Sequence, residues 1–168
     1  MSIKDCLARK GVSLTFDDCF SSVYYLVYPF LKEFNIPFTL FVTVEYIDKS
    51  PYLTAQQLKT LSSDPLCTIG AHTLTHTKLR SSKNSNDEIA GCKSALEKRI
   101  NKPVDLFAYP YGSIAMCSIK NLSEARSSGF KWAFSTVRGS TDSLLRMKYF
   151  LPRVNGDHLV RDYKENEK

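Results

Sequence analysis

The sequence contains no long apolar run. No stretch approaches the roughly 18–20 consecutive apolar residues that a membrane-spanning helix requires, so we predict no membrane span. An apolar signal-peptide core is also missing after Met1. We therefore expect a cytoplasmic location, with a leader removed upstream of Met1 as the alternative.

Basic clusters with interleaved aromatic residues, the pattern of a nucleic-acid-binding surface, are absent as well. The formal net charge is +6, but the lysines and arginines are spread along the chain. The densest basic stretches, 97–102 and 160–168, also contain acidic residues. We predict a solvated basic surface and no nucleic-acid partner, although a positive rim would steer an anionic ligand towards a site.

The chain has no C-x-x-C pair and an odd number of cysteines. Their wide spacing indicates reduced, packed thiols rather than a disulfide framework. They are Cys6, Cys19, Cys67, Cys92 and Cys117.

Internal repeats, low-complexity tracts and linker-like segments are missing too. A length of 168 residues suits one ordinary hydrophobic core better than two. We therefore predict a single domain over residues 1–168.

What the chain does contain is a regular alternation of strand-like and helix-like segments. Runs of β-branched and aromatic residues predict strands, and apolar residues at three- and four-residue spacing predict amphipathic helices. Strands are predicted at 12–16, 38–44, 67–72, 104–109, 131–136 and 149–154, and helices at 23–34, 54–61, 87–100 and 119–128. The apolar face of the first helix is expected to hold Val23, Val27, Phe30, Leu31 and Phe34. Repeated β–α units predict parallel strands with helical crossovers.

Chemically reactive residues gather at the predicted strand ends. Asp17 and Asp18 follow the first strand, His72 ends the third, and the segment YPYG (109–112) ends the fourth. Ligands of parallel α/β sheets bind at the carboxyl ends of the strands. We therefore expect these residues to meet on one rim.

Two adjacent carboxylates repel each other and resist desolvation, so the Asp17–Asp18 pair requires an explanation. A turn or helix N-cap would suffice for an isolated pair. His72 and His76, however, stand four residues apart, and one helical turn would place both imidazoles on the same side. With one carboxylate they make three ligands with open positions, which is typical of a catalytic metal site. Asp18 would then bind the metal, and Asp17 would stay ionised as a general base.

TFDD at 15–18, followed by HTLTH at 72–76, resembles the T-F-D-D and H-[S/T]-x-x-H motifs of the NodB-homology polysaccharide deacetylases, carbohydrate esterase family 4. FAYPYG at 107–112 is similar to the third motif of that family in the Y-P-Y-G form of biofilm-glycan deacetylases. The resemblance extends from about Val12 to Arg153. It implies an α/β fold, a distorted and incomplete (β/α) barrel.

The resemblance also implies metal-dependent removal of an N-acetyl, or O-acetyl, group from a carbohydrate, with an N-acetylated amino sugar as the expected substrate. Asp17 would be the catalytic base, and the backbone N–H of Tyr111 would stabilise the oxyanion. Thr73 would shape the loop between the histidines. Zinc is the expected ion, although iron, cobalt or nickel would suit the same ligands. The implied metal ligands are Asp18, His72 and His76.

Three positions depart from the pattern of this family. The arginine that orients the catalytic Asp is replaced by Ala108, and Arg153 either takes over that role or is a surface residue. No late general-acid histidine is found. We expect His158 to be an exposed turn residue, which leaves Asp17 or solvent to protonate the leaving amine. Cys19 stands where Gly or another small residue is common, and we expect a packed side chain, with an oxidation-sensitive thiol as the alternative.

Two other functions fit parts of the pattern. A non-catalytic glycan-binding relative would keep the fold and the metal. Two histidines and one carboxylate also form the facial triad of iron oxygenases, but those enzymes need no adjacent second carboxylate as a base. Trp132 could line a sugar-binding groove, but we predict that it lies in the core.

Overall fold

The structure is a computed structural model that describes residues 11–139 and 147–157. A parallel sheet of five strands forms its centre, in the order β1-β2-β3-β4-β5. The strands are β1 (Leu14–Phe16), β2 (Phe38–Val42), β3 (Cys67–Ala71), β4 (Leu106–Ala108) and β5 (Trp132–Phe134). The helices are η1 (Val23–Val27), α2 (Tyr28–Glu33), η2 (Val44–Tyr46), α3 (Ala55–Ser63), η3 (Leu79–Ser81), α4 (Ser85–Ile100) and α5 (Ile119–Ser127).

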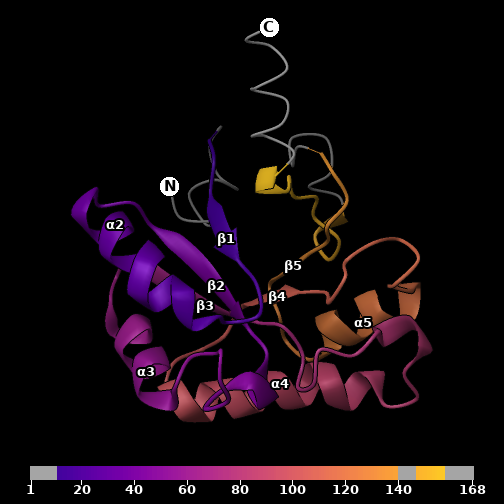
Figure 1. Cartoon of the computed structure of the whole chain (residues 1–168). Coiled ribbons are helices and arrows are strands. Elements are labelled where there is room, and N and C mark those ends of the chain that lie inside the picture. Colours follow the sequence, from indigo (N-terminus) through magenta and orange to yellow (C-terminus); the bar gives the residue numbers. More distant parts are fainter. Residues whose placement is uncertain (1–10, 140–146, 158–168) are drawn as a thin grey trace, which may run out of the picture.

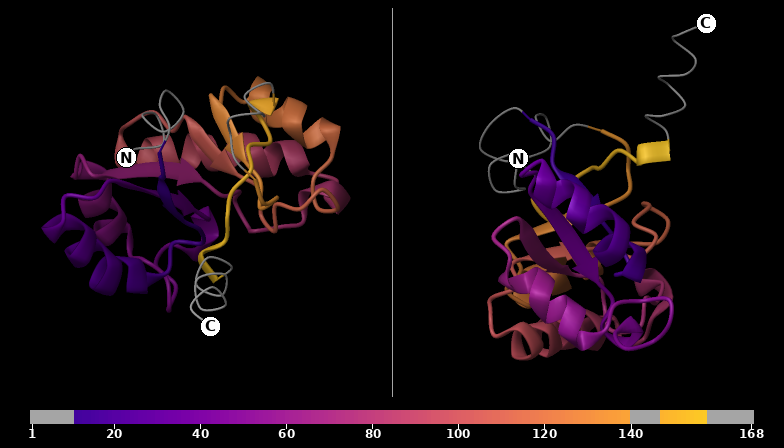
Figure 2. Two further views of the ribbon diagram at one scale, coloured as in Figure 1. Left: turned by 90° about the horizontal axis from the view of Figure 1, so that it is seen from above. Right: turned by 60° about the vertical axis from the view of Figure 1, so that its left-hand side comes forward.

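The sheet curls into an open half-barrel (Figures 1 and 2). Because the spatial order of the strands equals their order in the chain, every crossover steps the same way across the sheet. Right-handed crossovers then place all the helices on one face, and Figure 1 shows α2, α3, α4 and α5 around the outside. The predicted α/β fold, an incomplete (β/α) barrel, is confirmed.

Apolar residues fill both faces of the sheet. Strand β2 is buried at every position, as its run of β-branched and aromatic residues predicts. The predicted apolar side of α4 is buried against the outer face and consists of Ile89, Cys92, Leu96 and Ile100. A smaller cluster on the inner face contains Phe41, Leu106, Ala108, Phe134 and Leu151, with Trp132 packed against it. Trp132 is thus half buried against the core rather than inside it, so the prediction of a core position is met in part. It begins β5 and therefore lies at the amino end of the strands, away from the predicted site residues.

The first predicted helix is present, but two residues that were expected on its buried apolar face are exposed. Val23 and Leu31 are buried, whereas Phe30 is 56% exposed and Phe34 is 57% exposed. The reason is a π-helical turn, in which the N–H of Tyr28 donates to the carbonyl of Val23, five residues earlier. This turn adds a residue and rotates the following α2 relative to the assumed 3.6-residue period.

The sixth predicted strand is reduced to an isolated bridge. Leu151 pairs in parallel with Phe134, the last residue of β5. The next residue is Pro152, which has no N–H to continue a ladder. The backbone N–H of Arg153 still donates to the carbonyl of Val137 at 3.0 Å, so the segment stays beside the chain that continues from β5.

The described cysteines are free and buried, as predicted: Cys19, Cys67, Cys92 and Cys117. Burial raises the pKa of each thiol to about 12. Cys6 lies outside the described residues. Within the described parts of the chain, no helix has the length and apolar character needed to cross a membrane.

Candidate metal centre

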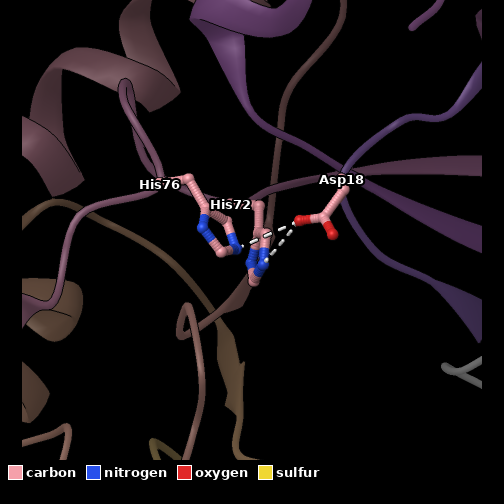
Figure 3. Close-up of side chains that lie close together, drawn as sticks. All are labelled: Asp18, His72 and His76. Atoms are coloured by element: carbon pink, nitrogen blue, oxygen red, sulfur yellow. Dashed lines mark ion pairs between the residues drawn. The ribbon is translucent and has the colours of Figure 1, made fainter. Parts of the chain in front are cut away.

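The carboxyl ends of β1, β3 and β4 bring the predicted site residues together. Asp18 follows β1, while His72 and His76 follow β3. Oδ1 of Asp18 lies 3.4 Å from Nε2 of His72 and 3.1 Å from Nε2 of His76 (Figure 3). One ligand atom from each of the three residues lies within 4.8 Å of the others. The expected convergence of these three residues on one rim is confirmed.

The donor atoms of this triad fit a divalent metal ion. Oδ1 of Asp18 is buried and accepts no hydrogen bond from the described residues, although both imidazoles point towards it (Figure 3). A buried carboxylate oxygen without a hydrogen bond is costly unless a cation compensates it. Two imidazole nitrogens and one carboxylate oxygen are suitable ligands for zinc and for other divalent transition metals. The triad could therefore hold a metal.

His72 is fixed in the form that a metal requires. Its Nδ1 lies 2.7 Å from the carbonyl oxygen of Ala108, so Nδ1 carries the proton and donates it. Burial lowers the pKa of His72, against the opposing effects of Asp17, of the Ala108 carbonyl and of Asp18. The ring is therefore neutral near neutral pH, and Nε2 faces the triad with a free lone pair.

The two histidines converge through an irregular loop, so the expected helical turn between them is wrong. Thr73 and His76 both have left-handed backbone conformations, with φ of 67° and 62°, which no helix contains. The N–H of His76 donates to Oγ1 of Thr73 at 3.0 Å. Thr73 thus shapes the loop, as its place in the motif implies.

Glu88 on α4 also supports this loop, and the sequence reasoning missed it. Its Oε2 accepts the N–H groups of Leu74 and Thr75, each at 3.0 Å, and its Oε1 accepts the hydroxyl of Thr75 at 2.8 Å. The sequence feature that could have indicated this role is a carboxylate in the first turn of a predicted helix, next to the polar loop that precedes the helix.

Asp17 is bound by Arg153. Two parallel hydrogen bonds of 2.7 Å join the guanidinium to Oδ1 and Oδ2 of Asp17, and the Arg153 side chain is only 15% exposed. Arg153 also donates to the carbonyl of Ser135 and to the hydroxyl of Thr15. Of the two readings left open for Arg153, the structure supports the one in which it orients Asp17.

The electrostatics keep Asp17 ionised. Burial by itself raises the pKa of Asp17, but the hydrogen bonds and charge of Arg153 outweigh it, so the pKa lies below its ordinary value. His72 and His76 lower it further. A carboxylate held in this way can accept a proton near neutral pH without being protonated beforehand.

Ala108 and Cys19, the other departures from the family pattern, are packed residues. Ala108 is fully buried in the inner cluster, and its carbonyl is the partner of His72. The thiol of Cys19 is buried and lies 3.8 Å from the carbonyl oxygen of Thr43. A buried thiol with a raised pKa is a poor target for oxidation, which supports the packed reading of Cys19.

Tyr111 lies at the same rim, in a tight turn after β4. Tyr111 and Gly112 have φ of 61° and 48°, and a Cβ on Gly112 would lie 2.5 Å from the backbone nitrogen of Thr136. The ring of Tyr111 meets the ring of His76 edge to face, with centroids 4.9 Å apart. Tyr111 is therefore beside the triad, whereas His158 lies outside the described residues.

Comparison with known proteins points to one family. A family model described as polysaccharide deacetylase matches residues 4–131. YxkH of Bacillus subtilis is 26% identical over 149 residues, which are 88% of this chain and 52% of YxkH. A poly-beta-1,6-N-acetyl-D-glucosamine N-deacetylase of Staphylococcus aureus is 24% identical over 163 residues, 87% of this chain and 54% of that protein. The chain thus spans about half the length of these curated relatives.

The fold has close counterparts among solved structures. The Streptococcus pyogenes deacetylase PplD, solved in complex with acetate, superposes with a TM-score of 0.81 at 24% identity, over 92% of this chain and 72% of PplD. IcaB from Ammonifex degensii superposes with a TM-score of 0.72 at 25% identity, over 87% of this chain and 68% of IcaB.

Proposed function

Because the chain belongs to the polysaccharide deacetylase family, we propose that it removes acetyl groups from an N-acetylated amino sugar of a glycan. The observation that carries this proposal is the meeting of the Asp18–His72–His76 triad with the Arg153-bound Asp17 on one rim. A metal site with a separate, oriented carboxylate suits hydrolysis of an amide by an activated water.

Asp18, His72 and His76 would hold the metal through one carboxylate oxygen and two Nε2 atoms. When bound, a divalent ion supplies Lewis acidity at the acetyl carbonyl and at the attacking water. We propose zinc as the ion, while iron, cobalt and nickel accept the same ligands. The backbone hydrogen bond of His72 and the loop contacts of Glu88 keep the ligand atoms in place.

Asp17 would act as the general base. Arg153 holds both of its oxygens, so the carboxylate cannot turn away from the rim. Asp17 would take a proton from the attacking water and later pass it to the leaving amine. The same proton thus makes both transfers, from the water to Asp17 and from Asp17 to the leaving nitrogen, without a late-motif histidine.

Tyr111 would stabilise the developing oxyanion through its backbone N–H. Its left-handed turn and its ring contact with His76 support this role, because they hold the residue at the edge of the triad. The same set of two histidines and one carboxylate occurs in iron oxygenases. Family membership and the ion-paired Asp17 favour hydrolysis.

Acetate release from acetylated amino-sugar oligomers, measured with metal-loaded protein, tests the proposal. We expect Asp17→Asn to retain the metal and to lose at least about 100-fold in kcat, the scale of general-base catalysis. His76→Ala is expected to lose both metal and turnover. If Asp17→Asn releases acetate at the wild-type rate, Asp17 is not the general base. Oligomer binding without acetate release in the wild type would instead indicate a glycan-binding relative.

A further inference from the structure

Aromatic rings form a continuous row along the rim that carries the metal triad. Phe20 follows β1, Tyr46 and Tyr52 follow β2, His76 follows β3 and Tyr111 follows β4. In the order Phe20, Tyr52, Tyr46, His76 and Tyr111, neighbouring ring centroids lie 4.9, 4.1, 5.9 and 4.9 Å apart. This aromatic row crosses the carboxyl ends of four adjacent strands and includes the metal ligand His76.

The ends of the aromatic row offer ring surface to solvent. Phe20 is 40% exposed and Tyr111 is 49% exposed. Between them, Tyr46 and Tyr52 are half buried and stacked, with an interplanar angle of 20°. An isolated β-bridge joins the backbone of Phe20 to that of Tyr52. Phe20 is therefore held in place by its tilted contact with the ring of Tyr52 and by backbone pairing, which pre-organises it for a ligand.

The two exposed ends differ in what surrounds them. The ring of Tyr111 already meets His76 edge to face, and the ammonium group of Lys78 lies 5.6 Å from its centroid. Tyr111 is thus directly at the triad, where the reacting sugar would lie. Phe20 contacts the single ring of Tyr52 and lies further along the row, where a neighbouring sugar could reach it.

The length of the aromatic row suits more than one sugar. Adjacent strands are about 4.8 Å apart, so the path along the curled sheet from β1 to β4 is about 14 Å, which exceeds one pyranose ring. The C–H face of a pyranose is apolar and packs on an aromatic ring, while its hydroxyls remain available for hydrogen bonds.

We propose that the aromatic row is a glycan subsite, in which Phe20 packs against the sugar adjacent to the one whose acetyl group reaches the triad. This inference rests on the proposed function, because it takes an N-acetylated amino-sugar oligomer as the ligand. It adds that Phe20 sets the preference of the site for a chain of sugars over a single sugar.

The test compares N-acetylglucosamine with its β-1,4- and β-1,6-linked tetramers. Phe20→Leu keeps an apolar side chain but removes the ring face. We expect kcat/KM for the preferred tetramer to fall about five- to ten-fold, the effect of losing one ring contact, and the monosaccharide rate to change less than two-fold. Phe20→Trp is expected to restore the tetramer rate.

Phe34→Leu is the matched control. Phe34 is also an exposed aromatic residue that contacts another ring, that of Phe30, with the two ring centroids 4.8 Å apart. It lies at the end of α2, just before β2 begins, and therefore at the edge of the sheet opposite the triad. We expect this variant to match the wild type on both substrates.

A binding measurement distinguishes the subsite from the catalytic step. Calorimetry compares the tetramer affinity of Asp17→Asn with that of the double variant Asp17→Asn, Phe20→Leu. A five- to ten-fold loss of affinity supports the subsite even if the wild type releases no acetate, in which case only the deacetylase function fails. If acetate is released but Phe20→Leu behaves like Phe34→Leu, the subsite is overturned and the function stands. The subsite is also overturned if Phe20→Leu loses equal kcat/KM on the monosaccharide and on the tetramer, or if the protein does not bind the tetramer.

Discussion

Arg153 is separated from Asp17 by 136 positions in the sequence, yet it binds both of its carboxylate oxygens at 2.7 Å. A guanidinium presents two parallel N–H donors that match the two oxygens of a carboxylate. The planar guanidinium of Arg153 also lies over the ring of Phe41, with Cζ 5.4 Å from the ring centroid. The orientation of the proposed base therefore depends on one residue from the last described segment of the chain.

Replacing Arg153 by Lys keeps the charge and removes the two-pronged contact. We expect kcat to fall about 10- to 100-fold, because a small displacement of a catalytic group has an effect of this size. Metal content should be unchanged, since the described contacts of Arg153 include none of the three ligands. Steady-state kinetics combined with elemental analysis checks both expectations, and wild-type kinetics would contradict the positioning role.

The charge of Arg153 also sets where activity is lost in acid. Burial raises the pKa of Asp17, and Arg153 opposes this effect more strongly than His72 and His76 do, so the pKa of Asp17 should rise in Arg153→Met. Activity requires ionised Asp17 and falls as the pH drops through its pKa, so the acid limb of the kcat/KM profile should move to higher pH in this variant. A profile that stays in place would mean that Asp17 is not the group that titrates.

Glu88 acts on the triad through the loop between the histidines. Removing it in Glu88→Ala leaves the N–H groups of Leu74 and Thr75 without their acceptor. We expect metal affinity to fall about 10-fold or more, as for other residues that orient ligands. Competition with a chelator measures this, and Glu88→Gln should recover part of the affinity because its amide oxygen still accepts.

Asp87→Ala is the control for the Glu88 variants. Asp87 is an exposed carboxylate in the same first turn of α4, so its removal has the same effect on the helix dipole. Equal losses of metal affinity in the two alanine variants would attribute the effect to helix stability rather than to the loop.

At the scale of elements, Asp64 joins α2, the end of α3 and the start of β3. Its Oδ2 accepts the hydroxyl of Tyr28 at 2.6 Å and the ammonium of Lys32 at 3.0 Å. Its Oδ1 accepts the N–H of Leu66 at 2.9 Å. These bonds, the Tyr28 hydroxyl first, lower the pKa of Asp64 from 3.8 to about 2.

Asp64→Asn should lower the free energy of unfolding by about 1–2 kcal/mol at neutral pH, the usual cost of losing a hydrogen-bonded carboxylate. Because the folded pKa is depressed, this stabilisation is present above pH 3.8 and is lost as the pH falls towards about 2. Urea denaturation at several pH values should therefore show the difference between wild type and variant shrinking in acid. A difference independent of pH would contradict the linkage.

At the scale of the whole molecule, the metal triad draws its ligands from the ends of β1 and β3, which are separated in the sheet by β2. A metal that binds these ligands in the folded state alone stabilises the complete half-barrel. The left-handed conformations of Asp18 and Cys19, with φ of 71° and 64°, each carry a penalty of about 1–2 kcal/mol. Metal binding would offset such strain.

Adding zinc to metal-free protein should raise the Tm progressively with zinc concentration. The gain in stability is about 2.7 kcal/mol when the free ion is at 100 times its Kd. Differential scanning calorimetry measures this shift, and His76→Ala should remove it. An equal shift in His76→Ala would show that the ion binds elsewhere on the chain.

Local sequence patterns are sufficient to predict the parallel α/β architecture and the members of the triad. Both follow from local patterns, since apolar periodicity locates strands and helices and the motif residues stand at strand ends. Parallel strands have their carboxyl ends at one edge, so Asp17, Asp18 and His72 were placed on one rim without coordinates. The four-residue spacing from His72 added His76, and the position of YPYG after the fourth predicted strand added Tyr111.

How these residues are held depends on contacts between distant parts of the chain, which local patterns do not encode. The partner of Asp17 depends on the curl of the sheet, which brings Arg153 to β1, and no local pattern encodes a contact over that separation. The irregular loop between the histidines forms because Thr73 and Glu88 satisfy its backbone N–H groups, which outweighs the tendency of a four-residue spacing towards a helix. The π turn before α2 likewise moved Phe30 and Phe34 to the surface, because one added residue changes every later angle around the helix axis.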